Sequence, residues 1–140
     1  MDISKVEQFA TPLLRAGITV LFLWFGLSQL TSPSDWVAWV PPWTENFGLS
    51  ATVVVLLNGL FETVLGALLA IGFYTRLAAF LLALHLLLVA YEIGYNDIGV
   101  RDFALAIATL SLAFFKSDQY TIDTKLSKEN TPASNSTSIS

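Results

Sequence analysis

The sequence predicts an all-α integral membrane protein, a four-helix antiparallel bundle with both termini cytoplasmic. Of the 140 residues, 54% are hydrophobic and 13% are charged, and the mean hydropathy is +0.64. A soluble domain carries about 25% charged residues, so this chain has too little polar surface to cover a water-soluble globule. Four apolar runs are long enough to cross a bilayer, and most basic residues lie on one side of these runs.

The apolar runs set the bounds of the predicted spans, because about 20 residues rising ~1.5 Å each cross a ~30 Å hydrocarbon core. The predicted spans are, approximately, residues 13–30, 49–74, 77–95 and 98–115. The connections after the second and third spans are very short, so the last three spans should be antiparallel neighbours. Residues 1–116 then form one transmembrane domain.

The distribution of basic residues predicts the orientation. They lie at the start of the first span, in the second connection and after the fourth span: Lys5, Arg15, Arg76, Lys116, Lys125 and Lys128. The connection at residues 31–48 has no Lys or Arg, and Arg101 is alone on that side. Because basic loops stay in the cytoplasm, both termini should be cytoplasmic in a multi-pass protein of the cell membrane.

The two segments outside the spans have different predicted roles. Residues 31–48 contain Trp36, Trp39 and Trp43. The first two would share one face of a short helix, either as an anchor at the membrane surface or as a lid over an outward-facing cavity. Residues 117–140 are rich in Ser, Thr and Asn, which predicts a disordered, polar cytoplasmic tail.

Composition excludes several classes of function. The chain has no cysteine, so it has no disulfide, thiolate metal site or iron–sulfur cluster. The 7 Lys and Arg residues form no basic cluster, so nucleic-acid binding is not expected. The sequence shows no haem, flavin, nucleotide or metal signature, and it contains one histidine.

Polar residues lie in single stripes on three of the predicted helices. Asn58, Glu62 and Gly66 are four residues apart, so they share one face of the second span. Glu62 and His85 each fall about halfway across adjacent helices, and a contact between them would lower the cost of burying both. They are the candidate catalytic residues, and the alternative is a carboxyl that only joins helices. The candidate binding residues are Arg15, Gln29, Asn58, Glu62, His85, Glu92 and Arg101.

Two further contacts are predicted from spacing. Glu92 and Arg101 should form an ion pair that joins the third and fourth spans near the headgroups. Gly59 and Gly66 form a small-residue strip that allows another helix to approach closely, including a helix of a second copy.

Three segments resemble the DoxX family of membrane proteins. "GLFETVLGALLAIGFYTRLAAFLLALHL" resembles the central signature of the family, and "LLRAGITVLFLWFGLSQL" and "NDIGVRDFALAIATLSL" are similar to its first and fourth spans. The resemblance implies a four-helix membrane protein, often encoded with redox partners, with one branch associated with a thiosulfate:quinone oxidoreductase. Matching polar positions are Arg15, Glu62, Arg76 and Arg101, and the family often has lysine at the position of Gln29.

These observations lead to two main hypotheses of function. The first is a membrane subunit of a redox system linked to the quinone pool, in which His85 and Glu62 bond a quinone oxygen and pass a proton. Its electrons would come from other membrane or redox subunits. The second is a non-enzymatic scaffold, assembly factor or lipid-binding protein. A pathway for protons or small solutes is a weaker third, because four helices enclose little lumen. Whether the chain is an enzyme is left open.

Overall fold

The computed structural model describes residues 8–115 and 120–129. Every regular element in these residues is a helix, so the all-α prediction is confirmed. Four long α-helices correspond to the predicted spans: α2 (Ala10–Thr31), α3 (Ala51–Ile71), α4 (Thr75–Ile93) and α5 (Asp97–Phe114). Three 3₁₀-helices follow α2, namely η1 (Pro33–Asp35), η2 (Val37–Trp39) and η3 (Pro42–Phe47), and a short helix α6 (Ile122–Glu129) follows α5.

Three helices of the described chain, α2, α3 and α4, are long and apolar enough to cross a membrane. The fourth helix, α5, is of similar length but carries Asp97, Arg101 and Asp102 in its first turns. Large apolar side chains are exposed along all four helices, for example Val20 at 68% and Leu88 at 60%. Such surfaces suit lipid, and they support a membrane protein.

Local sequence signals set the helix ends. Ser50 precedes α3 and its hydroxyl accepts a hydrogen bond from Val53 N at 3.4 Å. Asn96 precedes α5, and its Oδ1 accepts from Ile98 N and Gly99 N, both at 3.0 Å. Such caps satisfy the free N–H groups of a first turn. Gly72 ends α3 in the left-handed conformation (φ 70°), which is why this helix stops before residue 74.

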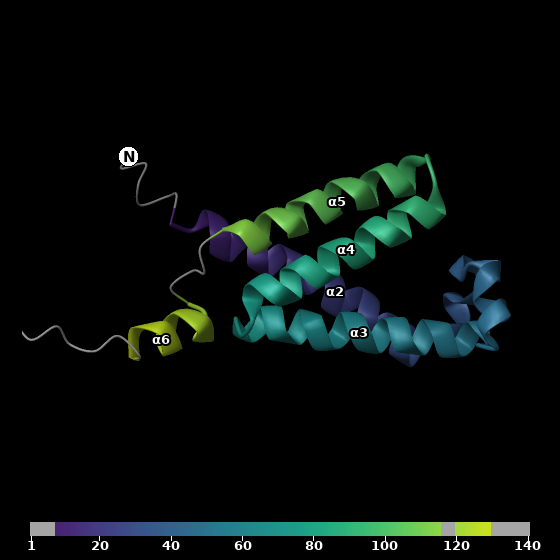
Figure 1. Ribbon diagram of the computed structural model, residues 1–140, viewed down its shortest axis with the longest axis horizontal. Coiled ribbons are helices and arrows are strands. Elements are labelled where there is room, and N and C mark those ends of the chain that lie inside the picture. Colours follow the sequence, from purple (N-terminus) through teal and green to yellow (C-terminus); the bar gives the residue numbers. More distant parts are fainter. Residues whose placement is uncertain (1–7, 116–119, 130–140) are drawn as a thin grey trace, which may run out of the picture.

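The long helices form two closely packed pairs (Figure 1). Helix α2 packs along α3, and α4 packs along α5, whereas contacts between α3 and α4 and between α2 and α5 are fewer. The start of α2, the turn from α3 to α4, the end of α5 and helix α6 all lie at one end of the molecule (Figure 1). The 3₁₀-helices and the turn from α4 to α5 lie at the other end.

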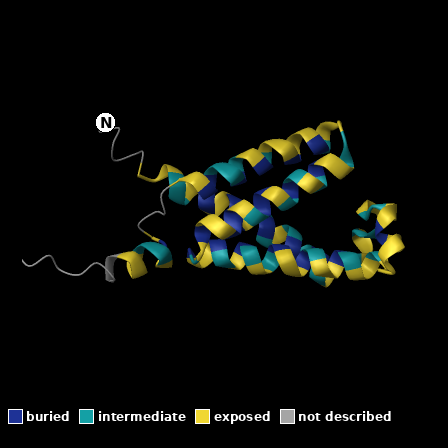
Figure 2. Ribbon diagram, in the orientation of Figure 1, coloured by how far each residue is buried: buried dark blue, intermediate teal, exposed yellow. Residues whose placement is uncertain are grey.

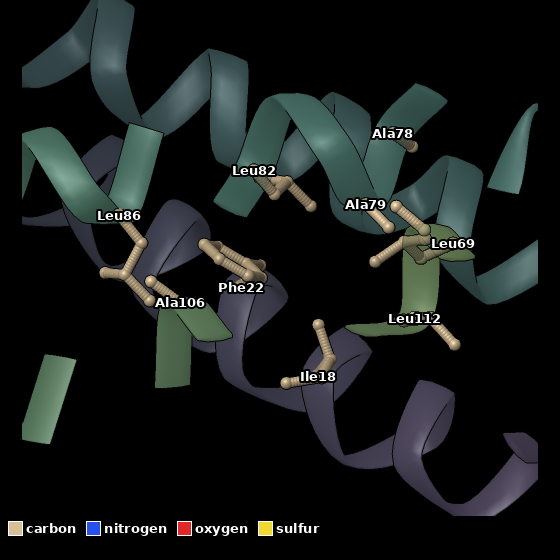
Figure 3. Packing of buried hydrophobic residues seen from close by; sticks show 10 residues of the cluster. Ile18, Phe22, Leu69, Ala78, Ala79, Leu82, Leu86, Ala106 and Leu112 are labelled. Atoms are coloured by element: carbon tan, nitrogen blue, oxygen red, sulfur yellow. The ribbon is translucent and has the colours of Figure 1, made fainter. Parts of the chain in front are cut away.

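Buried residues lie on the sides of the helices that face one another (Figure 2). The core draws on all four long helices, with Phe22 of α2 beside Leu82 and Leu86 of α4 (Figure 3). Where α4 meets α5 the core side chains are small: Ala78, Ala79, Ala83, Ala90, Ala106 and Ala113 are all buried. Small residues let helix backbones approach closely, as is typical of helix contacts in membranes.

The predicted glycine strip is used inside the molecule. A Cβ atom added at Gly59 would lie 2.9 Å from the carbonyl oxygen of Gly26, and one at Gly66 would lie 3.2 Å from Leu23 Cδ2. Helix α2 therefore fills the groove that these glycines leave on α3. The expected close approach of another helix is confirmed, but self-association through Gly59 and Gly66 is wrong, because α2 already covers both.

The tryptophan segment also differs from its prediction. The chain forms three 3₁₀-helices instead of one short helix, because prolines begin both η1 and η3. Trp36 packs edge-on against Phe25, with ring centroids 5.5 Å apart, and its Nε1 donates to Ser28 Oγ at 3.2 Å. Trp39 and Trp43 are more than half exposed. Exposed tryptophans at one end of apolar helices suit the headgroup level of a bilayer.

The predicted disorder from residue 117 is wrong for residues 122–129, which form α6. Asp123 joins this helix to the turn before α4. Its Oδ1 accepts from Tyr74 N at 3.0 Å, its Oδ2 accepts from Thr75 N at 2.9 Å, and its own N–H donates to Gly72 O at 3.1 Å. The physical reason is that the first N–H groups of α4 need an acceptor, and a carboxylate suits a helix N-terminus. Tail residues 117–119 and 130–140 lie outside the described parts.

Candidate functional site

Glu62 is buried near the middle of α3, with 6% of its surface exposed. Three side chains from three helices contact its carboxyl group. Gln29 Nε2 of α2 donates to Glu62 Oε2 at 3.0 Å, Asn58 Nδ2 donates to Oε1 at 3.2 Å, and His85 Nε2 of α4 lies 3.1 Å from Oε1. Asn58 Nδ2 also donates to Gln29 Oε1 at 2.7 Å. We call these four residues the polar cluster.

The structure therefore brings together four of the seven predicted binding residues. The contact between Glu62 and His85 is confirmed, and Asn58 lies one helical turn from Glu62 as the spacing predicted. Gln29 bonds the carboxyl group directly, although the sequence showed only that it shares a helix face with Arg15. The sequence did not show how closely α2 packs against α3, so it could not show that Gln29 would reach Glu62.

The amide groups restrict where a proton on Glu62 can be placed. The nitrogens of Gln29 and Asn58 face the two carboxyl oxygens, and an amide nitrogen cannot accept a hydrogen bond. Reversing both amides would set the oxygen of Asn58 against Glu62 Oε1, two acceptors in contact. If Glu62 carries a proton, the only neighbour in this cluster that can accept it in a hydrogen bond is His85 Nε2.

The second nitrogen of the imidazole ring is open. Within the described residues, His85 Nδ1 has no hydrogen-bond partner, and it is not among the fully buried side-chain atoms that lack one. The His85 side chain is 18% exposed, whereas that of Glu62 is 7% exposed. Phe61 packs against the imidazole, with ring centroids 5.2 Å apart and planes at 58°. The ring of His85 thus links a buried carboxyl group to the surface of the helix bundle.

Arg15 lies outside the polar cluster. Its Nη1 donates to the backbone oxygens of Leu69 at 2.7 Å and Ala70 at 3.1 Å, in the last turn of α3. Leu69 O also accepts from Gly72 N at 3.2 Å, and a cation at these last carbonyl groups stabilises that end of the helix dipole. Arg15 is 8% exposed, so these bonds offset the cost of burying its charge. The residue joins α2 to the end of α3, and it does not contact Glu62 through these bonds.

The predicted ion pair between Glu92 and Arg101 is wrong. Arg101 donates to its neighbour instead, with Nε and Nη2 each 2.9 Å from Asp102 Oδ1. Glu92 Oε1 accepts from Trp43 Nε1 at 3.2 Å, which ties the end of α4 to η3. Asp102 is 7% exposed and on the same helix as Arg101, so the guanidinium reaches it without crossing between helices. The spacing in the sequence did not show which acidic residue, Glu92 or Asp102, Arg101 would contact.

Sequence reasoning missed two residues at functional positions. Phe61 was counted only as part of an apolar run, although its place beside Glu62 on α3 is the signal that could have found it. Asp123 was assigned to a disordered tail, and no local pattern links it to residue 74. Among the described residues, no group of three His, Asp or Glu side chains could hold a metal ion.

The comparisons with known proteins agree with the resemblance. The DoxX family model matches residues 10–94, from the start of α2 to the end of α4. This range includes all four residues of the polar cluster, whereas Arg101 and the rest of α5 lie beyond it. Neither the curated proteins nor the solved structures gave a match to the chain. Since the family model covers more than half of the sequence, the chain belongs to the DoxX family.

Proposed function

We propose that the protein is a membrane subunit of a redox system, and that its polar cluster binds the head of a quinone and exchanges a proton with it. The observation that carries the proposal is the Glu62–His85 contact at 3.1 Å, together with the open second nitrogen of the same imidazole ring. An ionisable pair inside apolar helices is expensive, and such pairs are usually functional.

The geometry supports a simple sequence of proton movements. With the shared proton on Glu62, neutral His85 carries a proton on Nδ1 and donates a hydrogen bond to a quinone oxygen. If two electrons from a partner protein reduced the quinone, His85 would give this proton to one quinone oxygen and take the proton of Glu62 on Nε2. The second quinone oxygen would take its proton from water. The resulting carboxylate accepts hydrogen bonds from Gln29, Asn58 and His85 Nε2. Oxidation of the quinol would reverse each step.

The same proposal includes the topology. We place α2, α3, α4 and α5 across the cell membrane as a four-helix bundle, with both termini in the cytoplasm. The positions of the helix ends support this arrangement, because α2 starts and α5 finishes at the same end of the molecule (Figure 1). The charged first turns of α5 would then lie at the outer headgroups, where charges are tolerated.

Infrared difference spectroscopy of the protein in lipid nanodiscs, loaded with a short-tailed benzoquinone, tests the proton exchange. Reduction of the quinone should change a carboxyl band that is absent in Glu62→Gln, since the amide keeps the shape but cannot give up a proton. Asp102→Asn removes another buried carboxyl group outside the polar cluster and should leave the band in place. A spectrum in which Glu62→Gln retains the band would contradict the proposal.

The second candidate is a non-enzymatic scaffold, assembly factor or lipid-binding protein. It is favoured by the fact that all three contacts of Glu62 join α3 to itself or to α2 and α4, as a purely structural bond would. In that case Glu62→Gln should fold and support the host pathway at the level of the unaltered protein. The two candidates therefore differ in the activity of this single variant.

A further inference from the structure

The Nδ1 nitrogen of His85 lies where a polar atom without a hydrogen-bond partner is unfavourable. His85 is near the middle of α4, and a polar atom without a partner is unfavourable at mid-depth in a bilayer because no water is available there. Its Nδ1 has no partner in the described part of the chain. Glu62, Gln29 and Asn58 are turned toward each other, so none of them can satisfy this nitrogen without breaking an existing bond.

Exposed apolar side chains lie close to His85 and Phe61 along their helices. On α3, Leu60 is 52% exposed and Phe61 37%, and on α4, Leu84 is 48% exposed and Leu88 60%. A molecule that reaches His85 from outside must therefore cross a surface suited to hydrocarbon. In the proposed membrane arrangement, this surface suits the approach of a lipid-soluble molecule from the side of the bundle.

The ring of Phe61 favours a flat ligand beside His85. Its ring contacts the imidazole ring of His85, with centroids 5.2 Å apart and a 58° tilt, and more than a third of its surface is free. A tilted or offset contact between two aromatic rings stabilises by more than the burial of their surface alone. We infer that Phe61 and His85 together recognise a flat ring that carries an oxygen, with Phe61 contacting the ring and His85 Nδ1 bonding the oxygen. Phe61 is then a specificity residue of the site.

This inference rests on the proposed function, but it can fail separately. The chain has one histidine, so ¹⁵N labelling of histidine gives signals from His85 alone. The protein in nanodiscs is titrated with two probes of equal tail length, a benzoquinone and a straight-chain alcohol, and the Nδ1 resonance reports binding. Phe61→Leu removes the ring, and Phe61→Trp puts an aromatic ring back. Phe80→Leu is the control, because Phe80 is also an exposed phenylalanine but lies on α4.

We expect the benzoquinone to shift the Nδ1 resonance, and Phe61→Leu to weaken its binding by about threefold to tenfold, the effect of one aromatic contact. Phe61→Trp should recover most of the affinity, and the alcohol should bind all variants equally. Phe80→Leu should match the unaltered protein. The Nε2 resonance of each unliganded variant checks that the Glu62 contact is intact.

Three results would overturn the inference: no binding of the benzoquinone, binding without a shift of Nδ1, or an equal loss of both probes in Phe61→Leu. The last two leave the proposed function standing if Glu62→Gln still removes the carboxyl band on reduction. Conversely, if the ring preference is found but Glu62→Gln retains that band, the proton exchange fails and the recognition of the ring stands.

Discussion

At the scale of single residues, the polar cluster joins three helices through one carboxyl group. Glu62 accepts from Gln29 of α2 and Asn58 of its own helix, and meets His85 of α4. If the carboxyl group were removed, Gln29 Nε2 and His85 Nε2 would lose their partner, and Asn58 Nδ2 would keep only its bond to Gln29 Oε1. Leaving a buried polar group unpaired costs more than the net value of its hydrogen bond, so the cluster depends on the shape of Glu62 more than on its charge.

Glu62→Leu and Glu62→Gln should therefore differ in stability. The amide of Gln can still bond two of the three neighbours, so we expect a loss of less than about 1 kcal/mol in the free energy of unfolding. Leucine leaves the side chains of Gln29, Asn58 and His85 without this partner, and we expect a loss of about 1–3 kcal/mol. Unfolding in mixed micelles with increasing SDS measures both. Equal losses would show that hydrogen bonding at this position contributes little to stability.

At the scale of helices, close contact between α2 and α3 depends on glycines at the crossing. A Cβ added at Gly26 would lie 2.7 Å from Thr63 N and 2.9 Å from Gly59 O, which are backbone atoms that cannot move aside. The same approach brings Gln29 within bonding distance of Glu62. Packing of these two helices and the geometry of the polar cluster are thus linked.

Gly26→Ala should separate α2 from α3 and destabilise the protein by about 1–3 kcal/mol, the usual cost of an overpacked contact. It should also weaken the Gln29–Glu62 bond, which would change the ¹⁵N signals of His85. Gly17→Ala is the matched control on the same helix, since a Cβ there meets nothing within 4 Å. Equal stability of the two variants would mean that the crossing is looser than the structure shows.

The Asp123 side chain joins helix α6 to the turn before α4. Asp123→Ala removes the acceptor of the Tyr74 and Thr75 N–H groups. We expect these two amides to exchange hydrogen with solvent about tenfold faster or more, because each loses a bond of about 1.5 kcal/mol or more to a charged group. Lys125→Ala, on the exposed side of α6, should leave their exchange unchanged. Unchanged exchange in Asp123→Ala would show that α6 is held by other contacts.

At the scale of the whole molecule, four long helices run between two ends that differ in charge. The end with the 3₁₀-helices carries exposed Trp39, Trp43 and Tyr95, and its described residues include one basic side chain, Arg101. The end with the α3–α4 turn carries Arg15, Arg76 and Lys125. In the topology proposed above, the positive-inside rule predicts that the second end faces the cytoplasm.

Cysteines introduced singly at Ser34 and Ser134 test this topology, because the chain has no cysteine of its own. In intact cells an impermeant thiol reagent should label Ser34→Cys, on the connection between α2 and α3. It should label Ser134→Cys only after the membrane is opened. Labelling of both positions from outside would contradict the four-span arrangement with cytoplasmic termini.

The sequence by itself determined the helices and the central contact of the site. Apolar runs are local signals, so they predicted the four long helices to within about three residues at each end. Glu62 and His85 were paired from depth alone, because a short turn between α3 and α4 leaves little freedom in how these two helices align.

Only the tertiary structure decided which partners the other polar residues take. Gln29 reaches Glu62 because Gly26 and Gly59 let α2 approach α3, and Arg15 bonds the end of α3 at the same interface. Arg101 pairs with Asp102 instead of Glu92, and Asp123 of the tail caps the N-terminus of α4. The physical reason is that a hydrogen bond needs its atoms within about 3 Å, and such distances between separate helices follow from how closely and at what angle the helices pack.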